Sequence, residues 1–279
     1  MQDGALQDLK QFISNSRRLL VITGAGCSTA SGIGDYRDDQ GEWKRVQPVQ
    51  HQEFMSSLYW RQRYWARSQV GYPDFLRAAP NAAHQTLAAW EREGHVCGLI
   101  TQNVDRLHQR AGHQQVIDLH GRLDQVVCMQ CGHMMKRAVV QSWLDVHNKA
   151  LDAEVTSQQA EHLAPDGDAD VEADDFSAVK VPECPQCAGI LKPDVVFYGD
   201  SVPGPVVQQA YDWVDAADAV LVVGSSLMVF SSFRFVRRAA EAGIPVAAIN
   251  RGRTRGDEYF TCKVEQDCGR TLQLLSNSL

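Results

Sequence analysis

Residues 19–37 read LLVITGAGCSTASGIGDYR, a short apolar run that passes directly into a glycine-rich loop. An uninterrupted apolar run of this length is typical of a strand buried on both faces of a parallel sheet. Glycine at positions 24 and 26 permits a tight turn and a close approach of backbone N–H groups to an anion. The stretch therefore predicts an α/β protein with a ligand site after its first strand.

Other apolar runs also resemble strands, and patterns typical of helices lie between them. The predicted strands are residues 19–23, 96–101, 115–119, 194–198, 219–223 and 246–249, and the predicted helices are residues 5–13, 81–92, 205–217 and 233–242. This alternation predicts a Rossmann-like open parallel sheet with helices on both faces. Small or polar residues directly follow five of the strands. Because ligands of doubly wound sheets bind outside the carboxyl ends of the strands, we expect a binding crevice along that edge.

The glycine loop departs from two common nucleotide-binding motifs. A dehydrogenase fingerprint has a third glycine at the position of Thr29 and an acidic residue at the end of a second strand, and the sequence shows neither. A GxxxxGK[ST] loop is also absent from the sequence. On spacing alone, a nucleotide site of unusual type and a plain structural turn both stay open.

Two CxxC pairs predict a metal centre. Cys128 and Cys131 form one pair, Cys184 and Cys187 form the other, and 52 residues separate the pairs. Four thiolates are typical of a tetrahedral zinc site, which is structural because it leaves no coordination position for a reactant. The alternatives are two unrelated thiol pairs or a redox CxxC.

The net charge of −7 comes from one segment. Residues 144–176 contain ten Asp and Glu against one Lys, whereas the rest of the chain has 26 basic and 24 acidic residues. We interpret the segment as a solvated insertion, with attraction of lysine-rich partners as the alternative. Its run Asp166–Asp170 is not followed by the glycine at the sixth position and the glutamate at the twelfth that a calcium loop requires. Without a basic stripe, direct nucleic-acid binding is not expected.

The sequence also bears on location. It has no secretory signal and no run of about 18 apolar residues, so a membrane association is not expected. We expect a cytoplasmic protein, or a mitochondrial matrix protein if the source is eukaryotic. The cytoplasm is preferred because no transit peptide is visible.

A series of blocks resembles the sirtuin family in residue type, order and spacing. The blocks are GAGCSTASGIGDYR (24–37), TQNVDRLH (101–108), LHG (119–121), the two CxxC pairs, KPDVVFYGD (192–200), GSSLMV (224–229) and Asn250. RQRYWARS (61–68) and KPDVVFYGDSV (192–202) are most similar to the class II branch. The resemblance implies an NAD-dependent protein lysine deacylase, by default a deacetylase, that transfers the acyl group to ADP-ribose and releases nicotinamide. Mono-ADP-ribosyl transfer to a protein is the alternative.

The resemblance also implies a division into domains. Residues 1–43, 80–126 and 190–279 would form a discontinuous Rossmann-like NAD-binding domain. Residues 44–79 would form a helical cofactor-loop segment, and residues 127–189 a small zinc-binding domain that contains the acidic insertion 144–176.

Site residues carry over where the motifs match. His120 falls on the family's catalytic histidine, and Asn103 is assigned to catalysis with it. The implied cofactor-binding residues are Gly24, Ala25, Gly26, Asp35, Tyr36, Arg37, Gln102, Asn103, Asp105, Gly224, Ser225, Ser226, Asn250, Arg251, Gly252 and Cys268. The substrates would be acylated-lysine proteins or peptides, bound as an added strand between residues 194–199 and 224–229. Val196, Phe197 and Gly199 are the expected contacts, whereas Val195 is expected in the core.

Two side chains have a chemical role that can be argued directly. A neutral imidazole at His120 can remove a proton from a ribose hydroxyl, and the carboxylate of Asp105 can accept the nicotinamide carboxamide. The acyl group stays open. Tyr64 and Arg67 have the Tyr-x-x-Arg spacing of relatives selective for acidic acyl groups, whereas the surrounding block is similar to class II.

Overall fold

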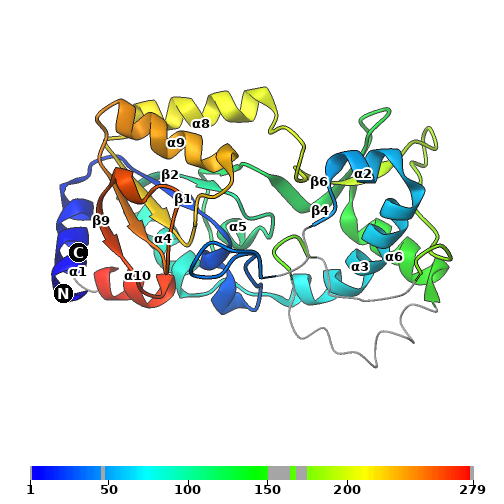
Figure 1. Ribbon diagram of the computed structural model, residues 1–279, viewed down its shortest axis with the longest axis horizontal. Coiled ribbons are helices and arrows are strands. Elements are labelled where there is room, and N and C mark those ends of the chain that lie inside the picture. The colour runs from blue at the N-terminus through cyan, green and yellow to red at the C-terminus, as the bar shows by residue number, and fades with distance from the viewer. Residues whose placement is uncertain (1, 45–47, 150–163, 168–174, 277–279) are drawn as a thin grey trace.

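The larger of two β-sheets in the structure consists of six parallel strands (Figure 1). The structure is a computed structural model that describes residues 2–44, 48–149, 164–167 and 175–276. In spatial order the six strands are β3 (Val116–Asp118), β2 (Val96–Thr101), β1 (Leu19–Thr23), β7 (Ala219–Val223), β8 (Val246–Ile249) and β9 (Phe260–Val264). The expected open parallel sheet is therefore confirmed. Four predicted strands have the predicted bounds, the strand at 115–119 is shorter, and β9 was not predicted.

Helices cover both faces of this sheet. On one side lie α8 (Gly204–Ala216) and α9 (Phe230–Glu241), and on the other α1 (Gln2–Asn15), α4 (Ala82–Arg92) and α10 (Cys268–Ser276) (Figure 1). Strand β1 shows why the apolar run is uninterrupted. Leu19 and Val21 belong to one buried cluster, whereas Leu20 and Ile22 belong to the other. No helix among the described residues is both long and apolar enough to cross a membrane.

A second, antiparallel sheet belongs to a smaller unit of the structure, which we call the small domain. It has the order β5-β4-β6, with β4 (Gly121–Cys128), β5 (Met134–Lys136) and β6 (Leu191–Val195). Helices α2 (His51–Ser56), α3 (Leu58–Arg77) and α6 (Arg137–His147) surround it, and their apolar side chains share one core with those of β4 and β6 (Figure 1). Along the chain, α5 (Leu107–Arg110) follows β2, and β3 leads from the parallel sheet into β4 of the antiparallel sheet.

The predicted strand at 194–198 is wrong in both bounds and partner. The strand is β6, it ends at Val195, and it pairs with β4 rather than with the parallel sheet. The apolar run DVVFY has the composition of a buried parallel strand, but composition cannot choose between two sheets. Beyond β6, Phe197 packs edge-on against Phe54 of α2, which draws the chain away from a regular ladder.

All four predicted helices are present, with bounds that differ from the predicted ones by up to three residues. Asn81 caps α4 as predicted, because its side chain accepts the amide of Ala83 at 2.8 Å. Helix α9, predicted to begin at residue 233, begins at Phe230. The reason is that Val229 is extended and its carbonyl accepts the amide of Phe233, so Phe230, Ser231 and Ser232 form the first turn.

The expectation of a wholly solvated acidic insertion is wrong for its described residues. Ala164 is 5% exposed and Phe176 is 3% exposed. Gly167 has φ +74°, and a Cβ there would lie 2.4 Å from Leu123 and 3.4 Å from Phe75. Residues 164–167 therefore dock on the small-domain core. Asp168 and Asp170, considered above for calcium, lie outside the described residues.

Candidate active site

A cavity of about 890 Å³ lies at the carboxyl ends of the parallel strands, beside the small domain. Loops that follow β1, β2, β3, β7 and β8 contribute to its wall, as the sequence predicted for that edge. The wall includes every expected cofactor residue except Asp105 and Gly252, and it includes His120, Val196, Phe197 and Gly199. Five strand ends, the loop 35–44 and the residues after β6 thus meet around one space.

The glycine loop and the β7 loop are packed backbone to backbone. A Cβ on Gly24 would lie 2.8 Å from Ser225 Cβ, and a Cβ on Gly26 would lie 3.0 Å from Gly224 Cα. Gly224 itself has φ +62°, where a side chain is strained. These positions therefore require glycine, and they bring two turns of backbone to the cavity wall.

Three amides on this wall are available for an anion. The backbone N–H groups of Ala25, Ser225 and Ser226 donate to no acceptor within the described part of the chain. Unpaired amides in adjacent turns are a common binding arrangement for phosphate oxygens. The loops therefore fit the diphosphate of a dinucleotide.

The β8 loop and the start of α10 close the far end of the cavity. Asn250 donates its side-chain amide to the carbonyl of Arg251 at 2.7 Å, and Arg251 lies 3.9 Å from Asp267. Burial raises the pKa of the Cys268 thiol to about 12, so the thiol is neutral. Gly252 is set back from the wall, because a Cβ there would lie 2.2 Å from the Asp39 carbonyl.

The loop 35–44 is held against the cavity by its own contacts. Asp35 pairs with Lys44 at 2.7 Å, and Arg37 donates to the Gly41 carbonyl at 2.7 Å. The guanidinium of Arg37 also lies 4.2 Å from the ring centre of Trp43. Tyr36, Trp43 and Tyr198 form a cluster of edge-to-face rings with centroids 5.5–6.0 Å apart.

Gln102, at the end of β2, links three loops of the site. Its side-chain amide donates to Ser225 Oγ at 2.6 Å, and its side-chain oxygen accepts from Ser232 Oγ at 2.9 Å. Its backbone carbonyl lies 3.1 Å from Nδ1 of His120. One residue thereby fixes the β7 loop, the first turn of α9 and the imidazole.

His120 is held as a neutral base. A carbonyl oxygen only accepts hydrogen bonds, so the contact with Gln102 places the proton on Nδ1 and leaves the lone pair on Nε2. Ser231 Oγ lies 2.7 Å from Nε2 and donates to it. Burial, more than the nearby charge of Arg234, lowers the pKa of His120 to about 4, so the ring is neutral at pH 7.

Asn103 and Asp105 are connected through one hydroxyl. Asn103 donates its side-chain amide to the Gly24 carbonyl and to Ser28 Oγ, both at 3.0 Å. Ser28 donates to the Asp105 carboxylate at 2.7 Å, and the amide of Leu107 donates to the same carboxylate at 2.8 Å. Burial raises the pKa of Asp105, and these donors oppose the shift. Asp105 thus lies two hydrogen bonds behind Asn103, through the Ser28 hydroxyl, rather than on the cavity wall.

The residues after β6 form the wall nearest the small domain. The amide of Val196 donates to the His120 carbonyl at 2.8 Å, which joins this segment to the end of β3. Phe197 is 9% exposed and lies 5.3 Å from the ring of Tyr64. Gly199 has φ +79°. Val195 is buried in the small-domain core as expected, although it also touches the cavity.

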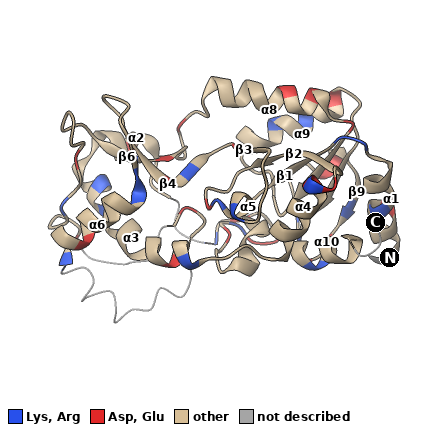
Figure 2. Ribbon diagram, turned by 180° about the vertical axis from the view of Figure 1, so that it is seen from behind, with Lys and Arg blue, Asp and Glu red and all other residues tan. Residues whose placement is uncertain are grey.

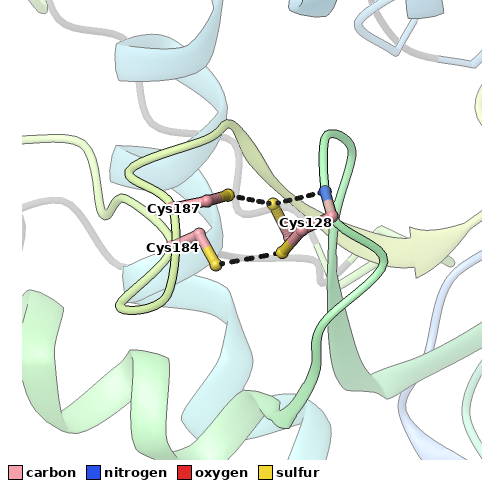
Figure 3. Close-up of side chains that lie close together, drawn as sticks. Cys128, Cys184 and Cys187 are labelled. Carbon is pink, nitrogen blue, oxygen red and sulfur yellow. Dashed lines mark hydrogen bonds between the residues drawn. The ribbon is translucent and has the colours of Figure 1, made fainter.

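The four predicted metal ligands lie together at the end of the small sheet. Their sulfur atoms are all within 4.8 Å of one another, with Cys128 and Cys187 at 3.5 Å and Cys131 and Cys184 at 3.7 Å. Figure 3 shows Cys128, Cys184 and Cys187 directed at a common centre. The amide of Cys131 donates to the Cys128 sulfur at 3.5 Å, and such bonds lower the pKa of the Cys128 thiol to about 6. Four convergent sulfurs, one set near thiolate, fit zinc.

Several residues of the wall were not anticipated from the sequence. They are Ser231 and Arg234 of α9 and the segment Pro165–Asp166 of the insertion. Of the Tyr-x-x-Arg pair considered from the sequence, Tyr64 lines the wall and Arg67 does not. A helix beginning at Phe230 would have placed Ser231 and Arg234 on one face, three residues apart. For Asp166, the local sequence gives no comparable signal.

Comparison with known proteins gives one consistent result. A model of the Sir2 family matches residues 24–231. The chain is 56% identical over 274 residues to NAD-dependent protein deacetylase 2 of Bradyrhizobium diazoefficiens, covering 97% of each chain. It is 45% identical to the mitochondrial NAD-dependent protein lipoamidase sirtuin-4 of Bos taurus, covering 97% of this chain and 85% of the relative.

Solved structures agree with the sequence comparison. A Sir2 complex with a p53 peptide and NAD⁺ is similar with a TM-score of 0.77 and 27% identity, covering 98% of each chain. A Sir2 bound to an acetylated peptide has a TM-score of 0.76 and 26% identity, again covering 98% of each chain.

The cysteine cluster generates the first prediction. We expect one zinc ion per chain, and we expect Cys184→Ser to lose it and to unfold the small sheet, because a serine oxygen is a poor fourth ligand beside three thiolates. Elemental analysis after chelator washing measures the metal, and limited proteolysis between residues 128 and 187 reports the unfolding. Cys97→Ser, in β2, is the matched control. Full zinc retention by Cys184→Ser would contradict the assignment.

Proposed function

The chain belongs to the Sir2 family and is an NAD-dependent protein deacylase, and we propose that His120 is the proton acceptor of its reaction. The observation that supports this role is the Nε2 lone pair of a neutral imidazole on the wall of the cavity. The cavity joins loops suited to a dinucleotide with the segment expected to bind a peptide. Protein mono-ADP-ribosyl transfer, the alternative from the sequence, is not favoured by the comparisons.

The residues that line the cavity suggest how the cofactor would be held. We propose that the amides of Ala25, Ser225 and Ser226 hold the diphosphate, and that Asn250 and Arg251 lie against the adenosine. NAD bound there supplies a ribose whose nicotinamide is a cationic leaving group. Because a weak nucleophile is enough to displace nicotinamide from the ribose C1′, the main task of the protein is to hold the acyl-lysine oxygen and the ribose in line.

His120 would accept one proton during the reaction. The Gln102 carbonyl keeps hydrogen on Nδ1, so Nε2 can accept a proton from a ribose hydroxyl without a change of tautomer. Ser231 occupies Nε2 with its own hydroxyl, and a substrate hydroxyl must take its place. Because the pKa of His120 is about 4, the imidazole is in its basic form throughout the physiological range.

Asn103 orients groups beside the base. Its side-chain N–H groups are used by the Gly24 carbonyl and Ser28, so its side-chain oxygen is left to accept from a ribose hydroxyl or a water. Asp105 fixes this arrangement through Ser28. We therefore assign Asp105 to positioning Asn103 and the nicotinamide pocket rather than to direct contact from the cavity wall.

Acylated proteins or peptides are the proposed substrates. The acetylated peptide and the p53 peptide in the two similar structures support a peptide site, and here it would be an added strand contacted by Val196, Phe197 and Gly199. We propose a cytoplasmic location and no nucleic-acid or membrane partner. We also propose the division into a Rossmann-like domain (1–43, 80–126, 190–279) and a remainder made of segment 44–79 and zinc domain 127–189.

The acyl group is proposed to be neutral. Tyr64 lines the cavity, but Arg67 is 7% exposed and does not, so the Tyr-x-x-Arg pair presents no guanidinium to an acyl chain. Asp166 also lines the cavity, and its charge contributes to the raised pKa of Tyr198, about 12, after the larger effect of burial. Acetyl is the default, and the lipoamidase name of the bovine relative supports longer neutral groups.

The role of His120 gives a direct prediction. Incubated with NAD and a panel of acylated peptides, the wild-type protein should release nicotinamide and lower the mass of the peptide by that of the acyl group. His120→Tyr should abolish both signals, because removing a positioned general base costs about 10²–10⁴-fold in rate. Zinc content and the circular dichroism spectrum should stay unchanged. A peptide that instead gains ADP-ribose, or a His120→Tyr variant with full turnover, would overturn the proposal.

The charge of Asp166 gives a second prediction. Asp166→Asn should raise kcat/KM for a succinyl-lysine peptide relative to the acetyl-lysine peptide by about five- to tenfold, since it removes a repulsion of about 1 kcal/mol at a partly buried site. Asp175→Asn, an exposed acid of the same insertion, is the control and should leave the ratio unchanged. Equal ratios in all three proteins would contradict a role of Asp166 in acyl choice.

A further inference from the structure

We propose that three arginines around Phe230 bind acidic residues that flank the acyl-lysine of a protein substrate. We call Phe230, Arg234, Arg237 and Arg255 the arginine rim. The inference rests on the proposed deacylase function, since it concerns the protein that presents the lysine, and it makes the sequence around that lysine a determinant of recognition.

The arginine rim is built on an exposed aromatic ring. Phe230 begins α9, is 44% exposed and lines the cavity. The guanidinium carbons of Arg234, Arg237 and Arg255 lie 5.2, 5.5 and 5.7 Å from its ring centre. Arg255 also lies 4.6 Å from the ring centre of Phe233. Cations collected over one exposed ring are held in place without being neutralised.

The charges of the arginine rim are largely unpaired. Within the described residues, neither Arg234 nor Arg255 has an ion pair, and Nε of Arg234 is buried without a hydrogen-bond partner. Arg237 pairs with Glu241 at 3.4 Å one turn along the helix. The nearby Asp257 is already bound by Thr254 and Lys263. The charges of Arg234 and Arg255 therefore stay without an ion-pair partner in the part of the chain that the structure describes.

Another arginine of the same helix shows the contrast. Arg238 makes two hydrogen bonds with Asp215 of α8, at 2.8 and 2.9 Å, and does not line the cavity. Figure 2 shows acidic segments on α8 and basic segments on the adjacent α9. Arg238 is thus neutralised by α8, whereas Arg234 lines the cavity without an ion pair among the described residues, and Arg237 and Arg255 lie beside it over Phe230.

The arginine rim lies where a bound peptide leaves the cavity. The expected peptide strand runs beside residues 224–229, and Phe230 is the next residue. The amide of Arg255 donates to the Ser226 carbonyl at 2.8 Å, and its guanidinium donates to the Met228 carbonyl at 3.3 Å, so Arg255 is fixed against that loop. Arg234 reaches further in, where it adds to the lowering of the His120 pKa. Residues next to the lysine therefore pass over these cations.

The chemistry of the arginine rim selects carboxylates. A guanidinium stacked on an aromatic ring keeps its N–H edge free, and that edge matches the two oxygens of a carboxylate. Aspartate or glutamate beside the acyl-lysine would gain one or two such contacts, whereas arginine or lysine there would be repelled. The diphosphate of NAD is the other available anion, but its proposed amides lie in the loops after β1 and β7.

Synthetic peptides test the inference without turnover. Fluorescence anisotropy of the intact protein, without NAD, would compare acetyl-lysine peptides whose flanks carry glutamates, alanines or arginines, on either side of the lysine. We expect the acidic peptide to bind about tenfold more tightly than the basic one at low salt, with the difference shrinking as salt screens exposed charges. Equal affinities of the three peptides would overturn the proposal.

Matched variants assign the effect. The quantity compared is the affinity for the acidic peptide divided by the affinity for the basic peptide. Arg255→Gln should reduce this ratio by about threefold, and Arg255→Glu should bring it to one or below. Arg238→Gln should keep the wild-type ratio. If Arg255→Glu leaves the ratio intact and weakens NAD binding instead, the arginine rim serves the cofactor and the proposal is wrong. If the wild-type protein turns over no acyl peptide, the deacylase function fails separately, while peptide binding still decides the role of the arginine rim.

Discussion

The hydrogen bond between the Gln102 carbonyl and Nδ1 of His120, 3.1 Å long, is the contact on which the site depends. It joins the end of β2 to the end of β3 and decides which imidazole nitrogen is basic. The same glutamine binds Ser225 and Ser232 with its side chain, so the β7 loop and α9 keep their positions relative to the base. A shift of any of these loops would therefore change the orientation of the proton acceptor as well as the cavity.

This arrangement needs the parallel sheet for a simple reason. Neighbouring parallel strands end at the same edge, so residues distant in sequence, such as Thr23, Thr101 and Val223, deliver their following loops to one place. The zinc cluster lies away from that edge, and no position of it opens to the cavity. Its role is to hold β4, β5 and β6, and just after β6 the amide of Val196 donates to the His120 carbonyl. Chemistry and metal are thus separate in space and connected through the small sheet.

Much of this could be predicted from the sequence because short-range constraints decide it. Glycine at positions 24 and 26 directly after an apolar run indicates a tight turn, and a five-residue apolar run is typical of a strand buried on both faces. The spacing of the four cysteines likewise limits what they can bind. Such features depend on a few neighbouring residues, so a pattern in one sequence is enough to indicate them.

The rest depends on contacts between distant segments, which no local pattern contains. The run DVVFY could not show that its first residues pair with β4. The helical start at Phe230 depends on the extended Val229, and the placement of Asp166 depends on Gly167 fitting against Leu123 and Phe75. These three misjudged features supply Phe197, Ser231 with Arg234, and Asp166 to the cavity. Of these residues, only Phe197 is expected at the site from the sequence, through the resemblance to the sirtuins, whereas Ser231, Arg234 and Asp166 emerge from the fold alone.

The most direct test is the nitrogen NMR spectrum of His120 across pH. In uniformly ¹⁵N-labelled protein, assigned by the signal that His120→Tyr removes, the account predicts an Nδ1–H tautomer that stays neutral until the pH falls toward about 4. An Nε2–H tautomer, or a titration near the ordinary histidine pKa of 6.5, would contradict it.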